Sequence, residues 1–147
     1  MIKDSGNRTE FASGAVRDIQ EGKGRCDLLP LDVVGTFLVS PTILLINDFQ
    51  KTGDVDYLYD AISSSGLFPN AYTAILEVAI HFEDGCKKYG ERNWEKGIPV
   101  SRYIDSAVRH YLKCMRGDND ERHDRAFVWN ILCAIWTVNH HKGDEDQ

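Results

Sequence analysis

The feature that most constrains the fold is the helical spacing of apolar residues over positions 101–116. An apolar residue returns there every three or four positions, which places these side chains on one face of an α-helix. The positions are Tyr103, Ile104, Ala107, Val108, Tyr111, Leu112 and Met115. Pro99 precedes the pattern and Gly117 follows it, so we expect a helix that begins near Ser101 and ends at Gly117.

Two further long helices are predicted on either side of this one. The first begins at Asn70, a good capping residue, and ends near Tyr89. Its expected apolar face consists of Ala71, Ile75, Val78, Phe82 and Cys86. The second runs from near Asp120 to about His141 and is apolar on most sides after its first two turns. We therefore expect it to be the central, buried helix.

The first half of the chain predicts shorter elements. Residues 1–30 are polar and contain many glycines, which indicates an extended or irregular N-terminal arm. The run LLPLDVVGTFLVSPTILLINDFQ predicts two short helices separated at Pro41, and a third follows with Asp54 as its cap and Gly66 as its end. No segment alternates as a strand does. The sequence thus predicts one all-α domain over 1–147, a helical bundle with its core helices in 70–141 and a solvated acidic tail, KGDEDQ.

Charge and hydropathy limit the classes of partner. The net charge of -6 argues against a nonspecific nucleic-acid binder, which carries a basic surface, but a small anionic substrate remains compatible with it. The N-terminal residues lack the apolar core of a signal peptide, and the longest apolar run, TFLVSPTILLI, is too short to span a bilayer. The four cysteines form no C-x-x-C pair, so we expect reduced, buried thiols. We expect neither a membrane nor a nucleic acid as partner.

A polar stripe is predicted beside the apolar face of the helix over 70–89. At about 100° per residue, Glu77, His81, Asp84 and Lys88 fall on one side of this helix, whereas Glu83 points to solvent. Such a stripe next to the core is typical of a metal site. The alternative is a ladder of ion pairs that only stabilises the helix.

A pair of carboxylates marks the start of the last helix. Glu121 and Asp124 are three residues apart, so we expect them one turn apart on the face that continues into the core. Two carboxylates there repel each other and lose hydration unless a cation lies between them, and Mg²⁺ or Mn²⁺ prefers such oxygen ligands. The alternative is that both acids only cap the helix.

Other motifs are weaker or absent. Asp105 and Arg109 are four residues apart next to His110, which suits either a phosphate contact or a surface ion pair. EGKGR lacks the spacing of a P-loop, and there is no G-x-S-x-G. His123–Asp124 allows a histidine–aspartate phosphohydrolase as an alternative enzyme class, with His81 or His110 as further ligands. That class needs a later helical aspartate, which the chain lacks.

The order of several motifs resembles one known family. GAVRDIQEGKGRCDLLP, HFEDGCKKYGERNWEKGIP, DSAVRHYLKCMRGDNDERHD and WN are together similar to the dATP/dGTP diphosphohydrolases common in bacteriophages, relatives of the MazG-like all-α NTP pyrophosphatases. The resemblance covers residues 14–30 and about 77–141. It implies a helical enzyme that uses a divalent metal, Mg²⁺ or Mn²⁺, to hydrolyse purine deoxynucleoside triphosphates to monophosphate and pyrophosphate. It also implies a homo-oligomer, a dimer or tetramer, in the cytoplasm, or in the host cytoplasm if the protein is phage-encoded.

The resemblance also suggests roles for individual residues. MazG-like enzymes carry an E-x-x-E pair and a later E-x-x-D pair; Glu121–Asp124 matches the second, but Ile80 stands where the first needs an acid. The expected catalytic metal ligands are Glu77, Glu121 and Asp124, joined as metal ligands by His81 and Asp84. The expected phosphate contacts are Lys23, Arg25, Lys88, Arg109 and His110. The expected base contacts are Asn93, Trp94 and Asn130.

Some alternatives stay open at this point. Trp94 equally suits a loop anchor packed on the core. The whole chain also suits a non-catalytic helical interaction protein in which the carboxylates only cap helices. Three aromatic residues expected on exposed faces, Tyr111, Trp129 and Trp136, favour self-association.

Overall fold

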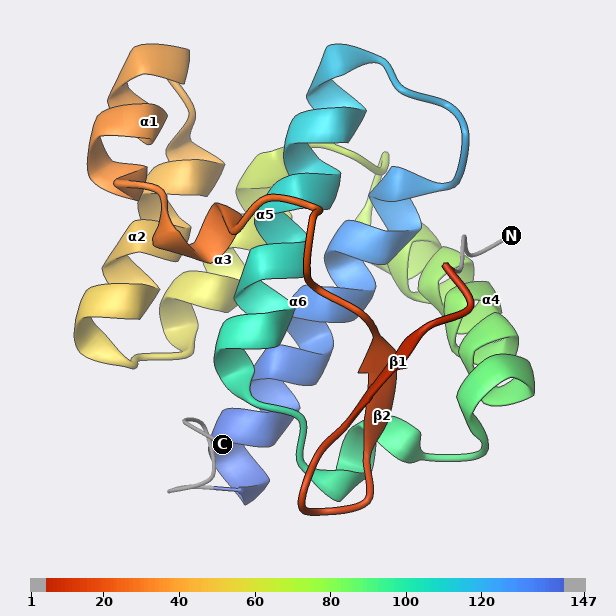
Figure 1. Ribbon diagram of the computed structural model, residues 1–147. Helices are drawn as coiled ribbons and strands as arrows, with labels where there is room; N and C mark the ends of the chain where they lie inside the picture. The colour runs from red at the N-terminus through yellow and green to blue at the C-terminus, as the bar shows by residue number, and fades with distance from the viewer. Residues whose placement is uncertain (1–4, 142–147) are drawn as a thin grey trace.

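Two long helices form the centre of the molecule (Figure 1). The computed structural model describes residues 5–141; the expected acidic tail, 142–147, lies outside this range. Helix α5 (Val100–Arg116) packs along α6 (His123–His140), and α4 (Ala71–Tyr89) packs against α6 on one side. Helices dominate the described part of the chain, so the all-α fold class is confirmed.

Three short helices lie on the other side of the central pair (Figure 1). They are α1 (Leu31–Leu38), α2 (Pro41–Thr52) and α3 (Asp56–Ser65), which pack in sequence order, and α3 reaches α6. The Ser40 hydroxyl accepts a hydrogen bond from the Ile43 backbone N–H, and Pro41 occupies the first helical position of α2. The predicted separation of two short helices at Pro41 is therefore confirmed.

The N-terminal arm contains a small hairpin that the sequence did not predict. Strands β1 (Arg8–Glu10) and β2 (Val16–Asp18) pair antiparallel, followed by the 3₁₀ turn η1 (Cys26–Leu28), which packs on α5. The expectation that no strand is present was wrong here. Asn93, in the 3₁₀ turn η2 (Asn93–Lys96), bonds both backbone groups of Val16 with its side-chain amide, at 2.9 and 2.7 Å. A tertiary contact, rather than an alternating pattern, thus holds this strand.

Helix α6 begins three residues later than predicted. Asp120, Glu121 and Arg122 lie in the loop before it, and the first helical residue is His123. The Gly117 φ of 93° ends α5, and the chain then bends before it can start a new helix. The expectation that Glu121 and Asp124 lie one turn apart on a helix face was therefore wrong.

The buried face of α4 also differs from the predicted one. Its buried residues are Ala74, Val78, His81 and Gly85. Of the five residues expected on that face, Ala71, Ile75 and Cys86 are exposed. His81 faces inward with them, so a polar ring takes a position on the buried face where an apolar side chain was expected. Glu83, as predicted, is exposed.

The hydrophobic core lies mainly between α5 and α6, where Tyr103, Ile104, Phe127 and Ile131 are almost fully buried. Tyr111 is buried, and Trp129 and Trp136 are half-buried in ring contacts, so the expected exposed aromatic face was wrong. These three aromatic residues therefore no longer favour self-association. The homo-oligomer stays a prediction. Within residues 5–141, no helix is long and apolar enough to cross a membrane.

Candidate functional site

A cavity of about 390 Å³ lies where the N-terminal arm crosses α4, α5 and α6. Its size falls within the range of small-molecule sites in proteins. Of the residues predicted as metal ligands, phosphate contacts or base contacts, six line it: Lys23, His81, Arg109, His110, Glu121 and Asn130. Residues from the N-terminal arm, α4, α5, the loop before α6 and α6 itself thus meet in one place.

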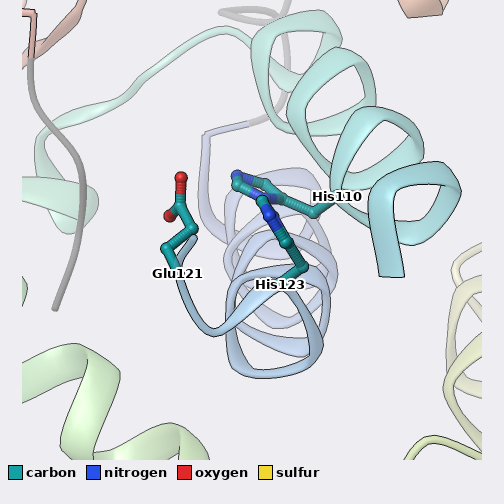
Figure 2. A group of neighbouring side chains, drawn as sticks. All are labelled: His110, Glu121 and His123. Atoms are coloured by element: carbon teal, nitrogen blue, oxygen red, sulfur yellow. The ribbon is translucent and has the colours of Figure 1, made fainter. Parts of the chain in front are cut away.

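A group of three side chains of the types that can bind a metal lies at the cavity (Figure 2). His110 projects from α5, Glu121 from the loop before α6, and His123 from the first turn of α6; one ligand atom of each lies within 4.8 Å of the others. Burial and then the neighbouring His123 lower the pKa of His110 well below its ordinary value, so this imidazole is neutral at pH 7. Two imidazoles and a carboxylate are a suitable donor set for a divalent metal.

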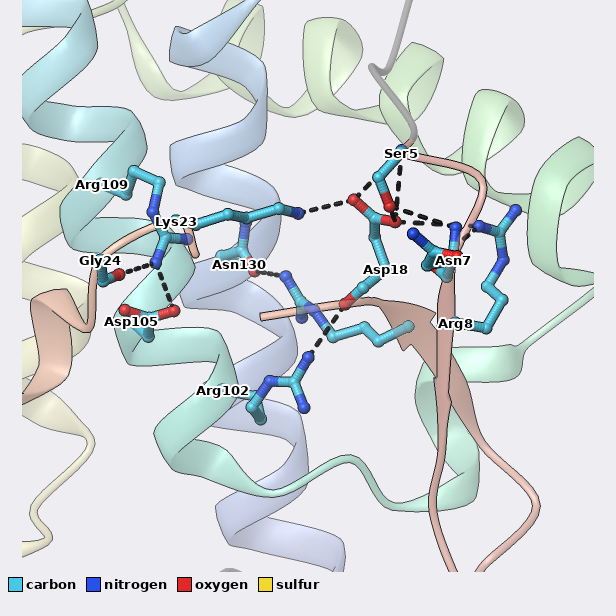
Figure 3. A network of polar contacts seen from close by, with 11 residues as sticks. Ser5, Asn7, Arg8, Asp18, Lys23, Gly24, Arg102, Asp105, Arg109 and Asn130 are labelled. Carbon is cyan, nitrogen blue, oxygen red and sulfur yellow. Dashed lines mark hydrogen bonds and ion pairs between the residues drawn. The ribbon is translucent and has the colours of Figure 1, made fainter. Parts of the chain in front are cut away.

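Five cationic side chains also line the cavity. Its positively charged lining residues are Arg17, Lys23, Arg102, Arg109 and Lys113. Figure 3 shows how several of them are held: Lys23 pairs with Asp18 at 2.6 Å, and Arg102 donates to the Asp18 backbone carbonyl at 2.9 Å. The Asn130 side-chain oxygen accepts a hydrogen bond from Arg17 Nη2 at 2.8 Å. Asp18 and Asp105 also line the cavity and pair with Lys23 and Arg109. The charges of Arg17, Arg102 and Lys113 remain to attract an anionic ligand.

Three of the cavity-lining side chains have a buried N–H donor without an acceptor among the described residues. These donors are Arg17 Nη1, Arg109 Nε and Trp129 Nε1. The Arg17 guanidinium also lies over the rings of Tyr103 and Trp129, at 5.0 and 5.6 Å from their centroids. Burial lowers the pKa of Arg17, and a buried donor without a partner is costly, so this lining is suited to a ligand that brings acceptor oxygens.

The predicted pair of Asp105 and Arg109 holds the arm over the cavity. The Asp105 carboxylate, which is 2% exposed, accepts hydrogen bonds from Arg109 at 2.6 Å, Gln20 at 2.9 Å and the Cys26 backbone N–H at 2.6 Å. Arg109 also donates to the Gly24 carbonyl. The pair is therefore buried, and the alternative of a surface ion pair was wrong.

Glu77 and Asp124 lie outside the cavity lining in a cluster with two arginines. Glu77 accepts from Arg125 Nη2 at 2.7 Å and from Arg122 Nη2 at 3.1 Å, and Arg122 also pairs with Asp124 at 2.9 Å. The hydrogen bonds from Arg125 are the main cause of the lowered pKa of Glu77. Two guanidinium groups already neutralise these carboxylates. Their roles as metal ligands stay predictions.

Three other predicted residues also lie outside the cavity lining. Arg25 forms a two-pronged ion pair with Asp27, at 2.8 Å for both contacts. Asp84 and Lys88 are half-buried on α4 but do not line the cavity. Of the four residues in the predicted polar stripe on α4, only His81 lines the cavity. Burial lowers the pKa of His81 to about 4, and its ring packs on Trp129 with centroids 5.2 Å apart.

Of the predicted base contacts, only Asn130 lines the cavity. Asn93 uses its side-chain amide to hold Val16. Trp94 packs edge-on against Trp136 and Phe82, at 5.0 and 5.6 Å between centroids. These contacts match the alternative interpretation of Trp94 as an anchor on the core.

Sequence reasoning did not single out several cavity residues, above all Arg17, Arg102 and Lys113. Arg17 lies in the polar arm, where no periodic pattern indicates which side chains turn inward. Arg102 and Lys113 lie on α5 beside its apolar face, where the sequence does not distinguish a cavity from solvent. Asp120 was predicted only as the start of a helix, yet it lines the cavity and bonds His123 at 2.7 Å.

The comparison with models of known protein families gives a match. The family model described as "dATP/dGTP diphosphohydrolase, N-terminal" matches residues 50–147, which is more than half of the chain. No curated protein and no solved structure matches this chain. The expected likeness to MazG-like enzymes in fold detail therefore stays a prediction.

Proposed function

The chain belongs to the dATP/dGTP diphosphohydrolase family, and from this premise we propose that it hydrolyses purine deoxynucleoside triphosphates to the monophosphate and pyrophosphate. The observation that carries this proposal is one cavity that combines cationic side chains with possible metal ligands. Its lining presents five cationic side chains together with His110 and Glu121, and within residues 5–141 Arg17 and Arg109 each keep a buried N–H donor without an acceptor. A nucleoside triphosphate needs both kinds of group, since cationic side chains and a bound metal ion each neutralise phosphate charge.

The cationic side chains would hold the phosphates in place. The Nη1 of Arg17 and the Nε of Arg109 are already fixed by the other contacts of their guanidinium groups, so they bind phosphoryl oxygens with little further ordering. Arg102 and Lys113 add positive charge around them. Hydrolysis of a phosphoanhydride is mostly a matter of positioning and charge neutralisation, which these side chains supply.

A divalent metal, Mg²⁺ or Mn²⁺, bound beside His110 and Glu121 would polarise the α-phosphate and lower the pKa of an attacking water. His81 is neutral at pH 7 because burial lowers its pKa to about 4, so it adds no charge to the cavity and offers an uncharged ring for contacts with the substrate. Trp129 and Tyr89 also line the cavity, and their ring faces suit a purine.

A product assay tests the proposal. The purified chain is incubated with each of the four dNTPs and either Mg²⁺ or Mn²⁺, and the products are separated by ion-exchange chromatography. We expect dGMP or dAMP with pyrophosphate. Triphosphate and a free nucleoside would instead indicate the histidine–aspartate class. A folded chain that turns over none of the four would indicate a non-catalytic interaction protein.

Two arginine variants test the cavity itself. Arg17→Met removes the buried donor and is expected to raise KM for dGTP at least tenfold, because a charged hydrogen bond contributes about 1.5–3 kcal/mol. Arg25→Met is the matched control, since Arg25 pairs with Asp27 outside the cavity lining. Equal KM values for both variants and the wild type would contradict the assignment of the cationic side chains.

A further inference from the structure

Three side chains around one edge of the cavity have the geometry of a metal site that differs from the E-x-x-E and E-x-x-D pattern. We propose that His110, Glu121 and His123 hold the divalent metal, and that Asp120 orients His123 from behind. The proposal deepens the function proposed above, on which its catalytic meaning rests. Its test needs no nucleotide.

The hydrogen bonds of His123 determine which of its nitrogens is available. Its Nε2 lies 2.7 Å from the Asp120 carboxylate, which only accepts, so Nε2 carries the proton. In this tautomer the Nδ1 of His123 therefore carries the lone pair that can bind a metal. A carboxylate behind a histidine in this way is a recurring outer contact of metal-binding imidazoles, because it fixes the tautomer and the ring orientation.

The separation of the two imidazoles suits a shared metal. Nδ1 of His123 lies 2.9 Å from Nδ1 of His110, which donates to it when only a proton is shared. Two nitrogens at this separation, each about 2.1 Å from a metal ion, subtend an angle of about 90° at the metal. Adjacent ligands of an octahedral ion have this angle. A metal can thus replace the shared proton after His110 changes tautomer, with little movement of either ring.

Glu121 supplies the carboxylate of the site. It lies beside the two rings in the loop before α6 (Figure 2), and within residues 5–141 its side chain has no hydrogen bond or ion pair. Glu77 and Asp124, in contrast, pair with Arg122 and Arg125. A cation near those two would have to displace guanidinium groups, whereas one beside Glu121 would not.

A second group also has metal-ligand spacing and consists of Asp118, Asp120 and His123. The hydrogen bonds of its members favour the group of His110, Glu121 and His123 instead. Arg116 already holds the Asp118 carboxylate through two hydrogen bonds. Asp118 does not line the cavity, whereas His110 and Glu121 do. A metal held by His110, Glu121 and His123 is therefore the one that a bound phosphate would reach.

The donor set predicts an ion preference. Two imidazole nitrogens and one carboxylate suit transition-metal ions, whereas Mg²⁺ prefers oxygen ligands and water. We expect Mn²⁺ to bind the nucleotide-free chain at least tenfold more tightly than Mg²⁺. Equal affinities for the two ions would contradict the histidine ligands.

Calorimetric titration of MnCl₂ into the nucleotide-free chain tests the ligand set. His110→Ala and Glu121→Gln are each expected to weaken binding more than tenfold, and Asp120→Asn by about 10- to 100-fold as an outer contact. Asp118→Asn and Glu77→Gln are the controls and are expected to stay within twofold of the wild type. A tenfold loss in either control with Glu121→Gln unchanged would overturn the proposal.

A spectroscopic measurement on the wild type covers the case in which a variant fails to fold. Pulsed EPR of the bound Mn²⁺ is expected to show ¹⁴N couplings from imidazole, and a bound ion without them would overturn the proposal. The two proposals fail separately. Mn²⁺ bound at this site without dNTP hydrolysis would contradict only the proposed function, and hydrolysis with the metal bound at Glu77 and Asp124 would contradict only the ligand assignment.

Discussion

Replacing Asp105 with asparagine tests how the N-terminal arm is held over the cavity. The carboxylate is 2% exposed and accepts from Arg109, Gln20 and the Cys26 backbone N–H. Asparagine has nearly the same shape, but it carries no charge and only one acceptor oxygen. Asp105→Asn therefore leaves the Arg109 guanidinium, whose side chain is 11% exposed, without its counter-charge.

The expected loss of stability follows from the burial of the Asp105–Arg109 ion pair. Breaking a buried ion pair by removing one partner costs about 3–5 kcal/mol, and the oxygen that asparagine retains places this case near the lower end. We expect the free energy of unfolding to fall by about 3 kcal/mol. For a chain of this size, that corresponds to a decrease in Tm of about 6–12 °C.

Urea unfolding followed by circular dichroism at pH 7 measures the loss. Asp60→Asn is the matched control, because Asp60 is exposed on α3, and it should change stability by less than about 0.5 kcal/mol. Limited trypsin digestion gives a second readout, since release of the arm exposes the bonds after Lys23 and Arg25. Cleavage there should be faster in Asp105→Asn than in the wild type.

The pH dependence has a defined sign. Burial by itself would raise the pKa of Asp105, but the hydrogen bonds from Arg109, Gln20 and Cys26 outweigh it and hold the pKa below its usual value. The carboxylate thus contributes stability above the unfolded pKa of about 3.9, and this contribution is lost as pH falls through the lowered pKa. A loss below 1 kcal/mol at pH 7 would refute the view that this buried ion pair fastens the arm.

Two further predictions concern α4 and α1. Because burial lowers the pKa of His81 to about 4 from about 6.5 when unfolded, protonation of the unfolded chain should reduce stability by about 3 kcal/mol as pH falls from 6.5 to 4. His81→Gln should flatten that part of a stability-against-pH curve, and an unchanged slope would contradict the assigned pKa. A Cβ on Gly35 would lie 2.7 Å from Leu44 Cδ2, so Gly35→Ala should cost about 1–3 kcal/mol in urea unfolding. Gly85→Ala, where a Cβ meets nothing within 4 Å, should instead stabilise the chain by about 0.5–1 kcal/mol, and the same sign for both would contradict this packing.

The sequence by itself predicted the helices, because their signals are local. The spacing of Tyr103, Ile104, Ala107 and Val108 specifies one buried face of α5, and the all-round apolarity of residues 126–138 makes α6 central. Asn70 caps α4 as predicted, through a hydrogen bond from the Thr73 N–H. The family, too, was indicated by the order of short motifs, and the family match confirms it.

Which residues line the site was determined only by the tertiary structure. A helical wheel places Glu77 and His81 side by side, but it does not show that Arg122 and Arg125, more than forty residues away, neutralise Glu77. Glu121 lies in the loop before α6 and not in the helix where it was predicted. Its carboxylate therefore lies near His110 and His123.

The N-terminal arm gives the clearest physical reason for this limit. Nothing in the residues around Arg17 indicates that its guanidinium turns inward over the Tyr103 and Trp129 rings to Asn130, 113 positions later. Helix formation depends on neighbours three and four residues apart, which a sequence displays directly. A binding cavity depends on charges and donors brought together from distant segments, and only the packed chain determines which of them meet.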